Sequence, residues 1–336
     1  MGTFIKRIAV YLPEKKITNE QLVGEFPEWD VDKIANKVGI ASRSVSAETE
    51  FSSDMAVKAG EMLMHENNLT PDTFDMLILC TQSPDYFLPT TACMVQHRLK
   101  LPTSAGAIDI NQGCSGYIYG LAFAQGLIAA GTCRNILFIT AETYSKHIHP
   151  KDKGNRTVFG DAATATWISA EEGIAELGGV VLGSDGSGAE NLIVRNGAMK
   201  AAKSGILIEE EKDIASSGDY LFMNGPEIFN FTLKAVPRLL ESTLKKNNLP
   251  KEKVDWFVFH QANKYMLDHL RKKLDIPEEK FILYMENCGN TVSSTIPIVL
   301  KNSFESKTFK SGDQIVLSGF GVGYSWGGTV LTFNAY

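Results

Sequence analysis

Cys114 has the sequence surroundings that best fit a catalytic nucleophile. An apolar run ends at Ile110, a short turn follows, and a stretch of small residues begins at Gly116. This pattern predicts a strand, a tight turn and a helix whose N-terminus lies beside the sulfur. The helix dipole favours a thiolate there, and the unpaired backbone N–H groups of the first turn can bind an anion. A buried core cysteine is the alternative that these residues alone leave open.

A histidine and an asparagine occur at similar strand-to-loop corners later in the chain. His260 ends the apolar run 256–259, and its unperturbed pKa near neutrality suits it to take and give a proton. Asn290 lies in a Gly-Asn-Thr turn before a run of small residues. Taken alone, a histidine is more often structural, and an asparagine in such a turn is ordinarily a turn residue or a helix cap. The two residues therefore indicate chemistry only in combination with Cys114.

An internal repeat suggests how these residues meet. Residues 67–80 and 247–260 align without a gap, and each segment has a helix end, a turn, an aspartate and an apolar strand. His260 takes the position of Cys80 in this alignment. Because α/β sheets present their chemistry at strand ends, we expect the two strand ends to face one shared cleft.

The strands and helices of both segments alternate, and the strands are apolar throughout. This indicates an α/β protein whose sheets are covered on both faces. A fainter similarity relates residues 135–139 to 314–318. We therefore predict two similar halves: residues 1–175 with the nucleophile, and residues 176–336 with the histidine and the asparagine.

The composition excludes several other classes of protein. The chain of 336 residues is 44% hydrophobic and 21% charged with a net charge of −6, which is typical of a large folded core and disfavours nucleic-acid binding. Its five cysteines are odd in number and lack CxxC spacing, so we expect neither a disulfide framework nor a metal site. No segment approaches the roughly 18 apolar residues of a membrane helix, and the N-terminal run is typical of a strand, not a signal peptide. We expect a cytoplasmic protein that does not insert into membranes.

The motifs together resemble the β-ketoacyl-[acyl carrier protein] synthase III family. The matching segments are Gly-Cys-Ser-Gly around Cys114, His-Gln-Ala-Asn from His260, Gly-Asn-Thr around Asn290, Phe-Gly-Asp at 159–161 and the glycine-rich stretch 318–328. The resemblance covers essentially the whole chain. It implies the thiolase fold, in which two β-α-β-α-β-α-β-β halves form five layers in the order α-β-α-β-α, usually as a homodimer.

The resemblance also implies a role for each residue. Cys114 would take an acyl group from an acyl-CoA or acyl-carrier thioester. His260 and Asn290 would polarise the carbonyl of a malonyl-type extender, such as malonyl-ACP, while it loses CO2. The backbone N–H groups of Cys114 and Val322 would form the oxyanion hole. The implied activity is that of an acyltransferase (EC 2.3.1.-) of fatty-acid synthesis without a tightly bound cofactor.

A helix expected after His260 carries a basic face. Its polar side includes Lys264, Lys272 and Lys273, and the last two match a basic pair that this family presents to the acidic carrier protein. We interpret this face as a docking site for acyl carrier protein. An ordinary solvated helix face is the alternative.

The chain departs from the family pattern where coenzyme A would bind. The family commonly has a tryptophan six residues before Gly39, where this chain has Lys33, and an arginine where it has Lys153. Asn263 is the third residue expected in this region. Two lysines cannot rebuild a planar stack on adenine, so we expect a primer other than acetyl-CoA. Leu88 stands where the family often has a phenylalanine that a partner subunit inserts into the acyl pocket.

Two other functions are compatible with the same fold. An acyltransferase that passes its acyl group to an oxygen, nitrogen or carbon nucleophile would not decarboxylate its acceptor. Related enzymes with an acidic base are disfavoured because residues 81–83 contain no glutamate. A non-catalytic subunit of a condensing heterodimer would not need Cys114. The sequence does not identify the acyl chain, the extender or the pathway.

Overall fold

The computed structural model describes residues 2–205 and 213–334. The first half of the chain forms a sheet with helices on both faces. Its main elements are β1 (Phe4–Tyr11), α3 (Ser52–Glu66), β4 (Met76–Cys80), α4 (Thr91–Arg98), β5 (Gly106–Ile110), α5 (Gly116–Ala129), β6 (Asn135–Glu142) and β7 (Ala162–Ser169). An excursion after β1 contains β2 (Lys16–Thr18), α1 (Asn19–Glu25), α2 (Val31–Val38) and β3 (Ser42–Ser44).

The second half repeats much of this order. Its main elements are β8 (Ala175–Leu177), β9 (Val181–Ser184), α8 (Gly225–Lys246), β12 (Trp256–Phe259), α9 (Lys264–Lys273), α10 (Thr295–Glu305), β13 (Gln314–Gly321) and β14 (Ser325–Phe333). The smaller elements are α6 (Lys153–Arg156), β10 (Leu192–Ile193), α7 (Ile214–Ser217) and β11 (Phe222–Met223). The predicted boundary between residues 1–175 and 176–336 falls within β8 and stays a prediction.

The strand pairing confirms the internal repeat. Strands β4 and β6 are parallel with Met76 opposite Ile136, and β12 and β13 are parallel with Trp256 opposite Ile315. Antiparallel pairs β6–β7 and β13–β14 follow in each half. The strand β8 pairs with both β1 and β14 and joins the two halves into one ten-stranded sheet, in which β9 pairs with β14 beside the main path.

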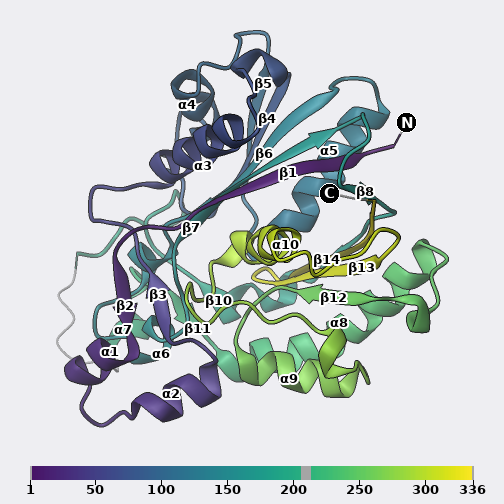
Figure 1. Ribbon diagram of the computed structural model, residues 1–336. Helices are drawn as coiled ribbons and strands as arrows, with labels where there is room; N and C mark the ends of the chain where they lie inside the picture. The colour runs from purple at the N-terminus through teal and green to yellow at the C-terminus, as the bar shows by residue number, and fades with distance from the viewer. Residues whose placement is uncertain (1, 206–212, 335–336) are drawn as a thin grey trace.

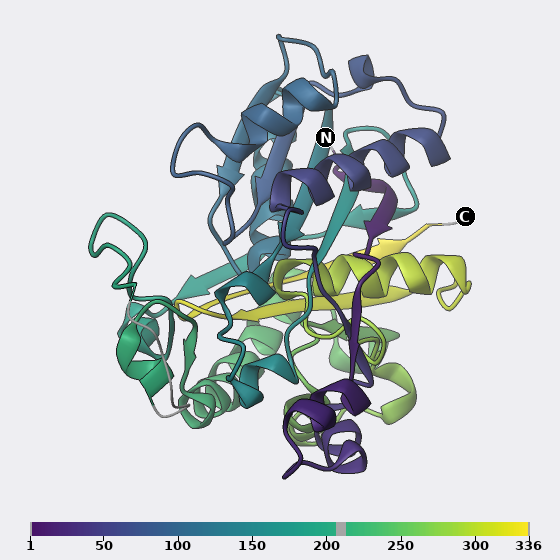
Figure 2. The same ribbon diagram turned by 90° about the vertical axis from the view of Figure 1, so that its left-hand side faces the viewer.

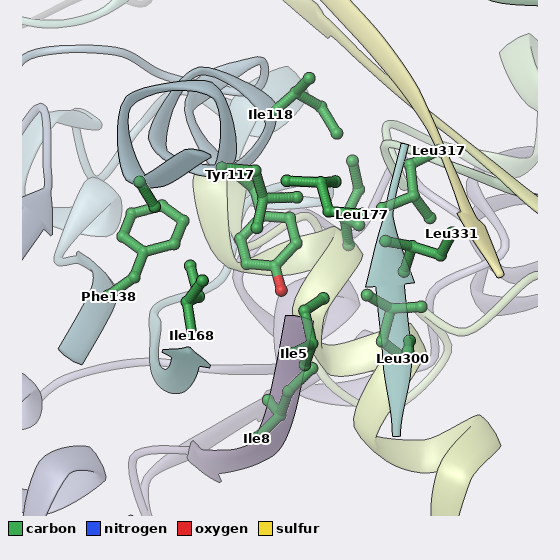
Figure 3. Close-up of a cluster of buried hydrophobic side chains, with 14 of the residues drawn as sticks. Ile5, Ile8, Tyr117, Ile118, Phe138, Ile168, Leu177, Leu300, Leu317 and Leu331 are labelled. Carbon is green, nitrogen blue, oxygen red and sulfur yellow. The ribbon is translucent and has the colours of Figure 1, made fainter. Parts of the chain in front are cut away.

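Five layers result from this arrangement (Figures 1 and 2). Helices α5 and α10 lie between the two half-sheets, where Tyr117 and Leu300 pack with residues of both halves such as Ile5 and Leu317 (Figure 3). Helices α3 and α4 cover the outer face of the first half, and α8 and α9 cover that of the second. This confirms the predicted order of layers. No helix in the described part of the chain is long and apolar enough to cross a membrane.

The second half differs locally from the implied pattern at its third strand. Only an isolated parallel bridge joins Phe257 to Phe281 there. The amide side chain of Gln261 provides hydrogen bonds that a neighbouring strand would otherwise make. It donates to the carbonyl of Ile282 at 3.3 Å and accepts from the N–H of Tyr284 at 2.8 Å. The segment is therefore held by a side chain where the first half has strand β5.

Candidate active site

Cys114 stands where the sequence pattern predicted, in the turn between β5 and α5. Helix α5 begins at Gly116, and Cys114 is buried at 6% exposure. The backbone N–H groups of Cys114 and Val322 both interact with its sulfur. Gly321 lies against it so closely that an added Cβ would come within 2.9 Å of the sulfur. The glycine-rich stretch thus leaves room for the backbone of β13 to approach the nucleophile.

Burial and a neighbouring carboxyl group oppose the thiolate form that the helix N-terminus favours. Burial raises the pKa of the Cys114 thiol to about 12, and the nearby carboxyl of Glu142 adds to the rise. The N–H groups of Cys114 and Val322 lower this pKa, but by less than burial and Glu142 raise it. Desolvation therefore outweighs the helix dipole, and the resting nucleophile is a neutral thiol that needs a base.

This pKa leads to a first prediction. In a pH titration from about pH 5 to pH 9, the ultraviolet thiolate absorbance of Cys114 should stay absent, because ionisation lies near its pKa of about 12. The measurement is the difference between the wild-type spectrum and that of Cys114→Ala, which cancels the other four cysteines. A thiolate step near neutral pH would instead indicate an ion pair with a histidine.

His260 follows β12 and is buried at 2% exposure. Its Nδ1 lies 2.8 Å from the hydroxyl of Thr295, and its ring meets the ring of Phe320 edge to face at 5.8 Å between centroids. Burial lowers the pKa of His260 to about 3, although the carbonyl of Val292 partly opposes this. The imidazole is therefore neutral at physiological pH and can act as a proton acceptor.

Asn290 links the two halves of the site. Its N–H donates to the carbonyl of Val158 at 2.9 Å, and its own carbonyl accepts from the N–H of Gly160 at 3.0 Å. Its side-chain Oδ1 accepts from the N–H of Val292 at 2.9 Å. This contact uses only the oxygen of the side-chain amide, so the NH2 group remains available as a donor. The Phe-Gly-Asp segment thus positions the asparagine.

The structure brings the three predicted residues to one buried region. His260 contacts Phe320, the residue before Gly321, which in turn contacts Cys114. The turn that carries Asn290 continues to Thr295, the partner of the histidine ring. A thiol, a neutral imidazole and an amide donor from two chain halves therefore share one site.

Glu142 is a site residue that the sequence argument missed. It ends β6 and is fully buried, and its carboxylate accepts from the N–H of Gln82 at 3.1 Å, from the hydroxyl of Ser83 at 3.2 Å and from that of Ser293 at 2.8 Å. Residues 81–83 themselves contain no glutamate, but β6 supplies one beside them in space. All of its contacts are structural, so we assign it a positioning role.

A second prediction concerns Glu142. Burial raises the pKa of its carboxyl from 4.5 to about 8, so the folded state holds this proton more tightly than the unfolded chain. The resulting stability is complete below pH 4.5 and is lost as the pH rises to about 8. Glu142→Gln should remove this loss, which amounts to several kcal/mol at about 1.4 kcal/mol per pKa unit. Urea unfolding at about pH 5 and pH 8 measures it.

The control for that experiment is Glu61→Gln, which changes an exposed glutamate of α3. It should keep the pH dependence of the wild type. An equal fall in stability for wild type and Glu142→Gln would contradict the assignment.

The region expected to bind coenzyme A contains an aromatic residue, Trp29, that the sequence argument did not consider. A cavity of about 510 Å³ is lined by Trp29, Asn263 and Tyr265 among others. The side chain of Lys33 lies outside the described part of the structure. Lys153 forms an ion pair with Glu28, the neighbour of Trp29. The inference that two lysines stand where the family has its stacking residues stays a prediction, but Trp29, four residues before Lys33, offers an indole in the same region.

The remaining predicted residues are at the surface. Leu88 is 83% exposed on a loop that also exposes Tyr86 and Phe87, and it contributes nothing to an acyl pocket within its own chain. On α9, Lys264 forms an ion pair with Asp268 at 2.7 Å. Lys272 and Lys273 are exposed and form no ion pair with any described residue.

Two family models match the chain. The model of 3-oxoacyl-[acyl-carrier-protein (ACP)] synthase III matches residues 108–186, and the model of its C-terminal part matches residues 244–333. The β-ketoacyl-[acyl-carrier-protein] synthase III of Clostridium perfringens strain ATCC 13124 is 37% identical over 323 residues, which cover 96% of each chain. That of Caldanaerobacter subterraneus is 34% identical over 327 residues, with 96% of each chain covered.

Solved structures agree with these relatives. The crystal structure of a 3-oxoacyl-(acyl-carrier-protein) synthase III superposes with a TM-score of 0.94 at 47% identity, covering 99% of this chain and 100% of the other. A 3-oxoacyl-(acyl-carrier protein) synthase from Burkholderia xenovorans LB400 gives a TM-score of 0.91 at 36% identity, covering 99% and 95%. The fold and the buried nucleophile thus define an enzyme of the thiolase fold with condensing chemistry. Within that class, the chain belongs to the β-ketoacyl-[acyl-carrier-protein] synthase III family.

Proposed function

We propose that this enzyme loads an acyl group onto Cys114 and condenses it with a malonyl-type thioester, malonyl-ACP in the first place, to give a β-ketoacyl product. The observation that carries the proposal is the combination of a buried thiol with two N–H groups at its sulfur and a neutral histidine and an amide donor in the same region. His260 takes the thiol proton, and the sulfur attacks the donor carbonyl. The N–H groups of Cys114 and Val322 stabilise the oxyanion.

The second half-reaction uses the other donors. Asn290 donates to the thioester carbonyl of the extender, beside the neutral His260, while the extender's carboxylate leaves as CO2. The resulting enolate attacks the acyl-cysteine and releases the sulfur. The site excludes bulk water, which strengthens these hydrogen bonds and protects the acyl-enzyme.

The test is a paired assay of CO2 release and β-ketoacyl product with an acyl thioester and malonyl-ACP. Equal amounts of both are expected. Acyl transfer to an acceptor without CO2 would instead support the acyltransferase alternative, and inactivity with every donor would support a non-catalytic subunit.

We propose that coenzyme A thioesters reach Cys114 past Trp29 and Asn263, and this replaces the expectation that acetyl-CoA is disfavoured. The cavity that these two residues line supports it, because an indole offers the flat surface that an adenine needs. Trp29→Ala should raise the KM for acetyl-CoA while leaving that for an acyl-ACP donor unchanged. Equal KM values for acetyl-CoA in wild type and variant would contradict the proposal.

We further propose that acyl carrier protein docks on Lys272 and Lys273, with Lys264 at the edge of the surface. These two lysines are exposed and have no ion-pair partner among the described residues, so the acidic groups of a carrier protein could form ion pairs with them. Lys272→Glu with Lys273→Glu should raise the KM for malonyl-ACP but leave acyl loading from coenzyme A unchanged.

We propose a homodimer that pairs the β5 strands of two copies. Within the described residues β5 has only β4 as a neighbour, and it exposes Ile108 at 47%. Leu88, on the neighbouring exposed loop, would then reach the acyl pocket of the partner subunit. Sedimentation of the wild type and of Ile108→Lys tests this. We expect a dimer for the wild type and a monomer for the variant.

We place the enzyme in the cytoplasm, because its five cysteines are free thiols.

A further inference from the structure

Thr295 controls the hydrogen-bonding of the catalytic histidine ring. It is the first residue of α10 and is buried at 2% exposure. Its Oγ1 lies 2.8 Å from Nδ1 of His260 and donates to the carbonyl of Val292 at 3.1 Å. A hydroxyl has one proton and two lone pairs. Because that proton lies on the bond to Val292, Oγ1 can only accept from the ring.

The proton of the neutral imidazole therefore resides on Nδ1. The carbonyl of Val292 is a second acceptor for it and acts on the same ring. Nε2 keeps its lone pair, and it makes no hydrogen bond within the part of the chain that the structure describes. A neutral imidazole in this form accepts a proton at Nε2 but cannot donate one there.

We propose that Thr295 is a positioning residue that holds the proton of His260 on Nδ1, so that the ring meets the Cys114 thiol as a base. This inference rests on the proposed function and deepens its first half-reaction: it names Nε2 as the nitrogen that accepts the thiol proton.

The proton balance of the cycle closes under this assignment. In loading, the S–H bond of Cys114 breaks, its proton moves to Nε2 of His260, the sulfur bonds to the acyl carbon, and the donor thiolate leaves and takes that proton from Nε2. In condensation, the extender loses CO2, its enolate carbon bonds to the acyl carbon, and the C–S bond to Cys114 breaks. The cysteine thiolate then takes a proton from water. One proton from water is consumed in each cycle, as the overall reaction requires.

Three variants separate this role from a structural one. Thr295→Val keeps the shape but removes the acceptor, while Thr295→Ser keeps the hydroxyl. Thr291→Val is the matched control, because the Thr291 hydroxyl is equally buried in the same turn and makes no hydrogen bond in the described structure.

The first measurement is the tautomer of His260 from nitrogen-15 spectra of histidine-labelled protein, with its signals assigned by their loss in His260→Ala. Wild type, Thr295→Ser and Thr291→Val should show the proton on Nδ1, and Thr295→Val should show a measurable share on Nε2. The second is the rate of acyl loading, which Thr295→Val should lower about two- to tenfold, the worth of one hydrogen bond. The effect is partial because the carbonyl of Val292 remains.

An unchanged tautomer in Thr295→Val, or an equal loss of loading in Thr295→Val and Thr291→Val, would overturn the assignment. Failure of the proposed function has a different signature. Wild-type enzyme would then form no acyl-cysteine and release no CO2, whatever the histidine spectra show.

Discussion

Replacing Cys114 with alanine should abolish the formation of β-ketoacyl product. The sulfur is the group that carries the acyl chain between the two half-reactions, and the neighbouring N–H groups serve only the carbonyl attached to it. The donors left in the site cannot supply a covalent intermediate, so the rate should fall by about a thousandfold or more. Product formation from acetyl-CoA and malonyl-ACP, measured at equal enzyme concentration, checks this.

Cys93→Ala is the matched control for that variant. Cys93 is an exposed cysteine on α4, outside the site. Its replacement should leave the rate unchanged. Persistent condensation by Cys114→Ala, above the rate without enzyme, would show that another group carries the acyl chain.

Replacing Asn290 with aspartate should separate loading from condensation. The aspartate keeps an oxygen that can accept from the N–H of Val292, which the native side chain does at 2.9 Å. It loses the NH2 donor and adds a negative charge where the enolate charge develops. Removing one such donor typically costs about a hundred- to a thousandfold in rate. Condensation should fall by this factor or more, while the rate of acyl loading on Cys114 stays within about twofold of the wild type.

Asn287→Asp, an exposed asparagine in the same loop, tests whether a charge in that loop is enough to reduce activity. It should retain full condensation. An Asn290→Asp enzyme that loads as slowly as it condenses would place the asparagine in the first half-reaction instead.

Much of the fold could be predicted from the sequence, because the patterns that indicate it lie within short segments of the chain. The gapless repeat of residues 67–80 and 247–260 contains β4 and β12, and the fainter one of residues 135–139 and 314–318 contains their parallel partners β6 and β13. The cysteine corner was also accessible, since an apolar strand, a turn and a helix of small residues are neighbours in the chain. Motif order then placed His260 and Asn290 with it.

Other features depend on contacts between distant segments. The raised pKa of Cys114 depends on burial by β13 and on Glu142 from β6, neither of which lies near it in sequence. Trp29 was missed because it precedes helix α2, whereas the residue count back from Gly39 led to Lys33 within that helix. The role of Thr295 required the distance between a hydroxyl and a ring nitrogen, which motif spacing does not contain.

The central claim is that Cys114 carries the acyl group, and intact-protein mass spectrometry tests it most directly. Wild-type enzyme, Cys114→Ala and Cys93→Ala would each be mixed with acetyl-CoA, longer acyl-CoA thioesters and acyl-ACP thioesters. The account predicts one added acyl mass on wild type and on Cys93→Ala, none on Cys114→Ala, and loss of that mass when malonyl-ACP is added. An adduct that survives Cys114→Ala, or one that malonyl-ACP does not discharge, would contradict it.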